Sequence, residues 1–364
     1  MTRAMMRKGL VVLLATMLIA PALRSQDAAA LFQHGMELRG DGDLAGALAD
    51  LKRAAGINPA LPGIHREIGL ILIEQRDFKT AASELRTAVR LNPNDFDSRY
   101  NLALSLANAG ALQESLKQAR ELVRLQPRWG LAFYGLGHIE ALSGNRQAAM
   151  QMFRVAVRLD PHAYRSWFEL GKLLEGSRDW EGAIRAYQTA AEIQPDSAAA
   201  RYRLAMLLKR TGQSASASTE FAAARELQET RAKGEQAATA YQHGLDLLEK
   251  SDYPAAIAEF QRALDLRPDF TETHAVLAEA HEQWGARLEQ ERQTSSAIEH
   301  YRSAIAVAPS AELENHLGVL LAQAGQLGAA IESFRAALAL DPQFQNAKKN
   351  LAQALAIQRG GHRP

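Results

Sequence analysis

The chain has 364 residues, with 42 Lys and Arg against 41 Asp and Glu, and it contains no cysteine. The absence of cysteine excludes disulfides, thiolate metal sites, a cysteine nucleophile and lipid attachment through cysteine. Aromatic residues make up only 6% of the chain, and Ala, Leu, Arg and Gln are abundant, which favours helices that meet through small side chains.

Residues 1–22 have the pattern of a signal peptide. Three basic residues precede the apolar run GLVVLLATMLIA (9–20), and Ala20-Pro21-Ala22 matches a small-x-small cleavage site. Because so short an apolar run does not span a bilayer comfortably, we expect export with cleavage, to the periplasm or the medium. The alternative is an uncleaved segment that anchors the protein in the inner membrane. The nearly neutral remainder gives no support to nucleic-acid binding, which needs a basic stripe.

Prolines mark a repeat along the rest of the chain. Pro59, Pro93, Pro127, Pro161 and Pro195 follow one another at intervals of 34 residues, and Pro268, Pro309 and Pro342 come later. When each proline is placed at position 32 of a 34-residue repeat, small residues align at positions 8 and 20 of nine repeats, and position 27 is alanine in every repeat except the third, which has Leu122. Position 8 reads Gly35, Gly69, Ala103, Gly137, Gly171, Ala205, Gly244, Ala278 and Gly318.

These columns predict pairs of antiparallel helices. Small residues at positions 8 and 20 allow two helix backbones to approach, a larger residue at position 24 fills the space beside them, and proline ends the second helix. No single pair buries its own apolar face, so neighbouring repeats must stack into a solenoid. The sequence therefore predicts an all-α fold.

The fifth repeat, WFELGKLLEGSRDWEGAIRAYQTAAEIQP, resembles the tetratricopeptide repeat in its Trp, Leu, Gly, Ala, Tyr and Pro positions. The resemblance covers residues 28–343 and implies a right-handed α-solenoid of about nine helix–turn–helix repeats, of the exported bacterial type. An apolar stripe on residues 344–358 indicates a C-terminal capping helix, and residues 359–364 are expected to form a flexible tail.

One interval breaks the pattern. Pro195 and Pro268 are 73 residues apart, and the proline due near Glu229 is replaced by the charged run LQETRAKGEQ (227–236). We interpret this as six repeats (28–231), a helical joint (232–236) and a second array of three repeats (237–343). FQHGMEL (32–38) and YQHGLDL (241–247) are the two places with histidine at position 7, as if the second array starts like the first. The interpretation predicts a change of superhelical direction near residue 232.

The eighth repeat contains seven extra residues. We place this insertion at about 286–295, where it would enlarge the turn and lengthen the first helix, with Thr294 or Ser295 capping the second helix.

No set of residues indicates catalysis. GDGD (40–43) falls where a helix–helix turn belongs and lacks the glutamate of a calcium loop. His274, His281 and His300 occupy positions that favour packing over a metal site. No serine has a nucleophile-elbow context, and the glycines do not form a phosphate-binding motif. We therefore predict that the protein is not an enzyme and holds neither a cofactor nor a metal.

The resemblance implies a concave groove formed by positions 2, 5, 9, 12 and 13 of the first helices. Aromatic residues recur at position 5, and basic residues gather in repeats five and six beside Glu169 and Glu175. Aromatic side chains dominate the energetics of many interfaces, although a packing column and a solvated charged face are the alternatives. The candidate groove residues are Tyr100, Tyr134, Phe168, Lys172, Tyr202, Arg203, Lys209 and Tyr241.

These features predict a non-enzymatic scaffold that binds a peptide or a helix of a protein partner in its groove, in cell-envelope assembly or export. The chaperone-tail clamp of some relatives is not supported, because no repeat has its Lys and Asn pair. The first alternative is a structural adaptor that self-associates into a homo-oligomer. The second is a glycan-binding or enzyme-accessory protein that uses the aromatic side chains to stack on sugars. No membrane contact is expected except through the N-terminal segment.

Overall fold

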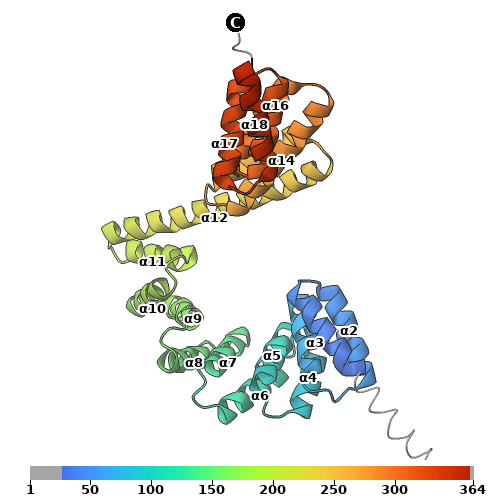
Figure 1. Ribbon diagram of the computed structural model, residues 1–364. Helices are drawn as coiled ribbons and strands as arrows, with labels where there is room; N and C mark the ends of the chain where they lie inside the picture. Colours follow the sequence, from blue (N-terminus) through green and yellow to red (C-terminus); the bar gives the residue numbers. More distant parts are fainter. Residues whose placement is uncertain (1–26, 361–364) are drawn as a thin grey trace, which may run out of the picture. The chain divides into compact units, whose positions relative to one another are not determined.

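The computed structural model describes residues 27–360, which form α-helices joined by short turns and contain no β-strand (Figure 1). The first helices of repeats one to six are residues 27–40, α3 (Ile64–Glu74), α5 (Phe96–Asn108), α7 (Gly130–Leu142), α9 (Tyr164–Gly176) and α11 (Ala198–Arg210). The second helices of repeats one to five are α2 (Leu44–Ile57), α4 (Phe78–Leu91), α6 (Leu112–Leu125), α8 (Arg146–Leu159) and α10 (Trp180–Ile193).

A single helix, α12 (Ser214–Glu249), is both the second helix of repeat six and the first helix of repeat seven. The remaining helices are α13 (Tyr253–Leu266), α14 (Thr271–Gln290), α15 (Thr294–Val307), α16 (Ala311–Gln323), α17 (Leu327–Leu340) and α18 (Gln345–Gly360). The structure thus has the all-α repeat fold that the sequence predicts. The expected signal peptide lies outside the described residues.

The turn inside each repeat depends on one left-handed residue. Its φ lies between 59° and 86° in all nine repeats, at position 15. Glycine adopts this conformation without strain, and the side chain of any other residue makes it costly. The nine residues are Gly42, Arg76, Gly110, Gly144, Arg178, Gly212, Ser251, Arg292 and Gly325. Gly42 confirms that the GDGD segment is a turn, and Asp43 caps the next helix by accepting a hydrogen bond from the Gly46 amide.

In the six repeats that have glycine at position 8, this glycine packs against the residue at position 24. A Cβ atom added to Gly171 would lie 2.8 Å from the nearest ring carbon of Tyr187, and one added to Gly318 would lie 2.5 Å from that of Phe334. Both rings are buried. Glycine is therefore required where a large buried side chain stands at position 24, because two helix backbones can approach only if one contributes no side chain.

Helix α12 passes through residues 232–236 without interruption. In the other repeats the second helix ends two residues before a proline, which disfavours helical backbone in the residue ahead of it. Here position 32 is Glu229, and two ion pairs four residues apart stabilise the exposed helix. Arg225 binds Glu229 at 2.7 Å, and Arg231 binds Glu235 at 2.8 Å. The helix continues because the proline is missing.

The contacts divide the chain into two compact units, with the boundary inside α12 between Ala224 and Arg225. In repeats two to six and in repeat nine, the residue at position 7 is a buried Ile or Leu. His34 and His243 are instead exposed, at 59% and 57% of the side chain, and each faces a carboxylate at position 23. The side chain of Asp50 accepts from His34 at 2.5 Å, and this hydrogen bond lowers the pKa of Asp50. Position 7 therefore has the same environment at the start of each unit.

The eighth repeat differs from the expected arrangement. Its turn is as short as the others, with Arg292 at the left-handed position, so the insertion does not enlarge it. The expected lengthening of the first helix is confirmed, because α14 has 20 residues. Gly285, two helical turns after Ala278, packs against Tyr301. An insertion of seven residues keeps the same helix face because two turns contain about 7.2 residues. Neither Thr294 nor Ser295 caps α15, whose N-cap is Gln293.

Helix α18 closes the second unit. Its buried Ala347 and Ala354 pack with residues of α16 and α17, while its polar residues remain exposed. It begins one residue later and ends two residues later than the expected capping helix. Among residues 27–360, no helix is long and apolar enough to cross a membrane.

Candidate functional site

The aromatic residues at position 5 pack mainly within their own repeats. The ring centroids of Tyr134 and Phe153 are 5.8 Å apart, and those of Phe168 and Tyr187 are 5.5 Å apart at an angle of 61°. Edge-to-face contacts of this kind stabilise aromatic pairs by about 0.5–1.5 kcal/mol beyond the area they bury. Tyr134 and Phe168 are accordingly only partly exposed. Tyr134 and Phe168 therefore stabilise their repeats by packing, which is the alternative to binding a partner.

Tyr100 lies between repeats three and four. Its ring centroid is 6.0 Å from that of Trp129, and a Cβ atom added to Gly135 would come within 2.7 Å of the Tyr100 ring. Burial raises the pKa of Tyr100 to about 12, and the neighbouring Tyr134 adds to this effect. Tyr100 therefore contributes more to the contact between repeats than to an open surface.

Tyr202 and Tyr241 belong to different units. Tyr202 packs on Phe221, with 5.6 Å between ring centroids, yet 47% of Tyr202 is exposed. Tyr241 packs on Phe260 and Phe270 in the second unit and is only partly exposed. Of the aromatic candidates, Tyr202 therefore presents the most accessible ring.

Two of the basic candidates are paired with the nearby carboxylates. Lys172 binds Glu169 at 2.9 Å, and Arg203 lies 3.5 Å from Glu175. The Tyr187 hydroxyl donates to Glu175 at 2.9 Å; burial and this carboxylate raise the pKa of Tyr187. Because these ion pairs are partly exposed, each contributes little to stability, and both cations remain near the surface.

Lys209 is exposed at the end of α11, and among residues 27–360 no carboxylate oxygen lies within 4.0 Å of its Nζ atom. Its neighbour Arg210, which the sequence places in the same basic group, lies over the Trp180 ring at 4.1 Å. Of these two neighbouring cations, Arg210 is held by an aromatic ring, whereas the candidate Lys209 has no carboxylate partner among residues 27–360.

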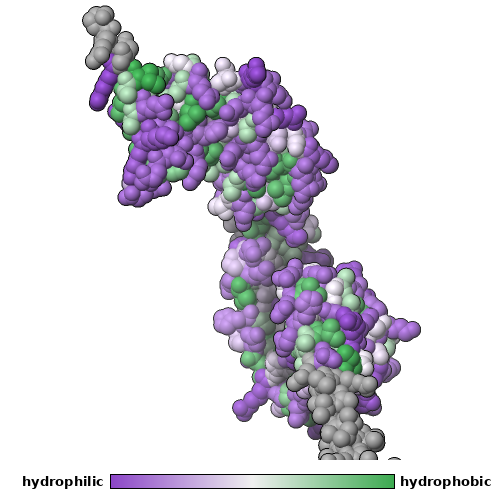
Figure 2. Space-filling view, turned by 45° about the vertical axis from the view of Figure 1, so that its right-hand side comes forward, coloured by the Kyte–Doolittle hydropathy of each residue, from purple (hydrophilic) through white to green (hydrophobic). Residues whose placement is uncertain are grey.

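Three exposed apolar side chains on first helices are absent from the predicted site. Leu131 and Leu142 of α7 are 43% and 51% exposed, and Met206 of α11 is 47% exposed, one helical turn after Tyr202. All lie in repeats four to six. Figure 2 shows that hydrophilic residues cover much of one face of the protein, with hydrophobic residues scattered among them. Positions 2, 9 and 13 face the implied groove, so reading those columns as well as position 5 would have found these three side chains.

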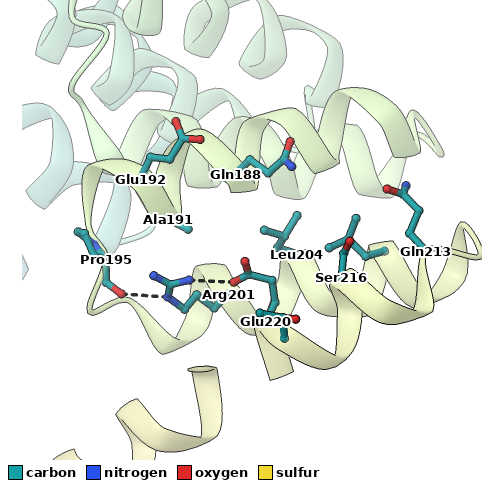
Figure 3. A pocket seen from close by; sticks show the side chains of 11 residues that line it. Gln188, Ala191, Glu192, Pro195, Arg201, Leu204, Gln213, Ser216 and Glu220 are labelled. Carbon is teal, nitrogen blue, oxygen red and sulfur yellow. Dashed lines mark hydrogen bonds and ion pairs between the residues drawn. The ribbon is translucent and has the colours of Figure 1, made fainter. Parts of the chain in front are cut away.

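A depression lies where repeats five and six meet. It has a volume of about 480 Å³ between α10 and the first part of α12, with Leu204 and Arg201 among its lining residues (Figure 3). Arg201 donates to the Pro195 carbonyl at 3.0 Å and to Glu220 at 2.9 Å. Arg201 stands at position 4 of its repeat. The side chains at position 4 of three other repeats, His65, Arg99 and Trp167, also bond to the carbonyl oxygen of the proline that ends the preceding repeat. The polar groups of this depression therefore connect successive repeats.

The histidines of repeat eight form a pair and not a triad. The Nδ1 atoms of His281 and His300 are 3.0 Å apart, and the Trp284 ring stacks on His300 with 3.9 Å between centroids. His274 is exposed. Within residues 27–360, no three His, Asp or Glu side chains come together as metal ligands would. Burial and the His300 side chain lower the pKa of His281 to about 4, and burial lowers that of His300.

This pair predicts that the second unit loses stability in mild acid. Below pH 6.5 the unfolded chain protonates these histidines, whereas His281 stays neutral in the fold until about pH 4, so stability falls across that window. After allowance for partial exposure, we expect a loss of about 1–2 kcal/mol. Urea unfolding measured from pH 7 to 4 should show a smaller pH dependence for His281→Gln. The exposed His274→Gln control should keep the wild-type pH dependence; equal profiles for all three proteins would contradict the prediction.

Stacked pairs of antiparallel helices, with glycine at position 8 and proline at position 32, define the class of helical-repeat solenoids. Family models described as tetratricopeptide repeat match residues 66–128, 174–239, 241–286 and 283–343. The chain belongs to the tetratricopeptide repeat family. The fold is therefore that of a scaffold for protein–protein interaction.

Solved structures share this fold. MamA from Desulfovibrio magneticus RS-1 is 22% identical, with 46% of this chain and 94% of MamA covered and a TM-score of 0.41. PilF from Pseudomonas aeruginosa is 20% identical, with coverages of 54% and 90% and a TM-score of 0.47. YrrB, described as having an unusual peptide-binding site, is 20% identical, with coverages of 54% and 97% and a TM-score of 0.42. No curated protein matches the chain.

Proposed function

We propose that this protein is a non-enzymatic scaffold that holds a peptide or a helix of a protein partner against the first helices of repeats four to six. The observation that carries the proposal is the exposure of large apolar side chains there. Every first-helix residue among the exposed large apolar side chains of residues 27–360 comes from α7 or α11: Leu131, Leu142, Tyr202 and Met206. Apolar surface of this kind gains free energy when a partner covers it.

The cations nearby favour a partner segment that is acidic as well as apolar. Lys172 is exposed on α9, and Arg203 and Lys209 are exposed on α11, the helix that also carries Tyr202 and Met206. Carboxylates of a partner would attract these cations at long range and orient the segment, while the apolar contacts would supply most of the affinity. Tyr100, Tyr134 and Phe168 would then act by holding the repeats in place.

The setting is a second part of the proposal. Residues 1–22 have the pattern of a signal peptide, which supports a role in the periplasm or outside the cell, in envelope assembly or export. The lack of a catalytic constellation in the sequence supports a non-enzymatic role.

Site-specific photo-cross-linking tests the binding surface. A benzophenone amino acid at Met206 should capture a discrete protein partner from envelope extract, whereas the same residue at Leu340, 49% exposed on α17, should not. Replacing Leu142 by Glu should reduce the adduct at position 206 about ten-fold. The partner would then have to bury the glutamate carboxylate against its own apolar side chains, which is unfavourable.

Both substitution sites are exposed, so circular dichroism should show unchanged helix content and exclude unfolding as the cause. The same adduct at positions 206 and 340, or no reduction with Leu142→Glu, would contradict the proposed surface. An adduct with a second copy of the chain would favour the self-associating adaptor. A surface that retains glycans but captures no protein would favour the glycan-binding alternative.

A further inference from the structure

The second helices of repeats one to four carry basic residues at two repeating positions. Positions 25 and 29 are one helical turn apart, so they lie on the same face of each helix. We call the seven residues the basic strip: Lys52, Arg86, Arg120 and Arg154 at position 25, and Arg90, Arg124 and Arg158 at position 29. In repeats five to seven these positions hold Gln188, Glu192, Ala222, Glu226, Gln261 and Asp265. Repeats eight and nine have a basic residue at position 25 alone, Arg302 and Arg335, with alanine at position 29. We therefore limit the strip to the successive helices α2, α4, α6 and α8.

All seven side chains of the basic strip are exposed. Three of them form ion pairs, which are Arg86 with Glu114 at 2.9 Å, Arg120 with Glu140 at 2.8 Å and Arg124 with Glu121 at 2.7 Å. For the other four, no carboxylate oxygen of residues 27–360 lies within 4.0 Å. The pairs of Arg86 and Arg124 are exposed on both sides and contribute little to stability, so these two guanidinium groups can exchange a carboxylate for a phosphate at small cost. The partner of Arg120, Glu140, is buried, so that pair is kept.

Exposed aliphatic side chains directly follow position 29. Ile57, Leu91 and Leu159, at position 30 of repeats one, two and four, are 39%, 48% and 38% exposed. Beside α6, a depression of about 460 Å³ is lined by four basic residues, Arg99, Lys117, Arg120 and Arg124, by one acidic residue, Glu121, and by two glutamines and a leucine. The surface therefore combines cations, aliphatic side chains and a basic depression large enough for a phosphate headgroup.

We propose that the basic strip binds the first unit to the surface of an anionic phospholipid bilayer. Guanidinium groups bind lipid phosphates through paired hydrogen bonds, and exposed Leu and Ile side chains gain free energy by entering the interfacial region. The strip repeats from helix to helix, which suits an extended surface of identical headgroups. A nucleic acid would leave the aliphatic side chains without apolar contacts, and the strip lacks the aromatic anchors typical of protein interfaces.

A fluorophore placed within the strip tests this contact. Because the chain has no cysteine, Gln151→Cys on α8 and the control Gln188→Cys on α10 each provide one labelling site, and both positions are exposed. With the full chain, vesicles of equal parts phosphatidylglycerol and phosphatidylcholine should shift the emission of an environment-sensitive label at position 151 to the blue. The label at position 188 should not shift, and neither label should respond to phosphatidylcholine alone.

Replacing arginines of the basic strip by glutamine measures how much each charge contributes to membrane binding. Each cation near an anionic surface contributes about five-fold to membrane partitioning, so Arg154→Gln with Arg158→Gln should weaken the response at position 151 about 25-fold. The matched pair Arg178→Gln with Arg185→Gln removes two exposed charges outside the strip and should weaken it far less.

Three outcomes would overturn the proposal. In the first, the chain sediments with vesicles while the label at position 151 stays unchanged, which would locate membrane contact elsewhere, for example at residues 9–20. In the second, neutral and anionic vesicles give equal shifts. In the third, polyglutamate or single-stranded DNA shifts the label at concentrations where anionic vesicles do not, which would assign the strip to an acidic protein or a nucleic acid.

Discussion

Replacing Gly318 by Leu is expected to lower the free energy of unfolding of the second unit by about 3 kcal/mol. Three ring atoms of the buried Phe334 lie within 3.0 Å of where a Cβ atom would stand, and overpacking here separates α16 from α17. The same substitution at Gly328, where no atom lies within 4 Å, should leave stability unchanged or raise it slightly. Urea unfolding and amide hydrogen exchange in α16 and α17 measure both effects.

Repeat three shows how the sequence tolerates a larger residue at position 8. It has Ala103 there and Ala119 at position 24, so neither helix presents a large side chain to the other. The double change Gly318→Ala with Phe334→Ala should therefore show a coupling energy of at least about 1 kcal/mol in a double-mutant cycle. If Gly318→Leu were as stable as Gly328→Leu, the packing described for position 8 would be wrong.

Replacing Gly234 by proline is expected to destabilise α12 by about 3 kcal/mol, because proline removes a backbone hydrogen bond and collides with the preceding turn. Gly234→Ala should instead stabilise it by about 0.5–1 kcal/mol, since no atom lies within 4 Å of the added methyl group. Amide hydrogen exchange over residues 225–240 should become faster in the proline variant and slower in the alanine variant.

These two variants also test the proposed joint. If residues 232–236 formed a loop in solution, proline and alanine would have similar small effects, and exchange there would be fast in the wild type. The change of superhelical direction near residue 232 remains a prediction, which scattering measurements on the wild-type protein can test separately.

Much of the fold could be predicted from the sequence because its determinants are local. Proline at position 32 ends a helix through its own ring, and glycine at position 15 adopts the left-handed turn without help from other residues. Four turns lack this signal, since Arg76, Arg178, Ser251 and Arg292 take the same conformation against their preference. The surrounding helix pair imposes that conformation, so only the repeat register locates those turns.

The insertion in repeat eight was placed wrongly for a related reason. Counting residues from the preceding proline assigned position 8 to Ala278, whereas the packing partner of Tyr301 is Gly285. A shift of two helical turns preserves the helix face, so the pattern of apolar residues fits both registers. Only the contact between α14 and α15 distinguishes them.

The net charge of the chain does not reveal the basic strip. The nearly equal totals of basic and acidic residues argued against an extended anionic partner, but a total does not record where the charges lie. Repeats two to four have a basic residue at both position 25 and position 29, whereas each repeat after them has at most one.

The sequence by itself determined the helices, the turns and the order of the repeats, because each depends on residues close together in the chain. Tertiary structure alone decided which side chains are available to a partner. Tyr134 and Tyr202 occupy the same column, yet Tyr134 is partly covered while 47% of Tyr202 is exposed. Exposure depends on every neighbouring side chain at once, including Phe153 and Phe221 from the paired helices, and no single position in the sequence records that sum.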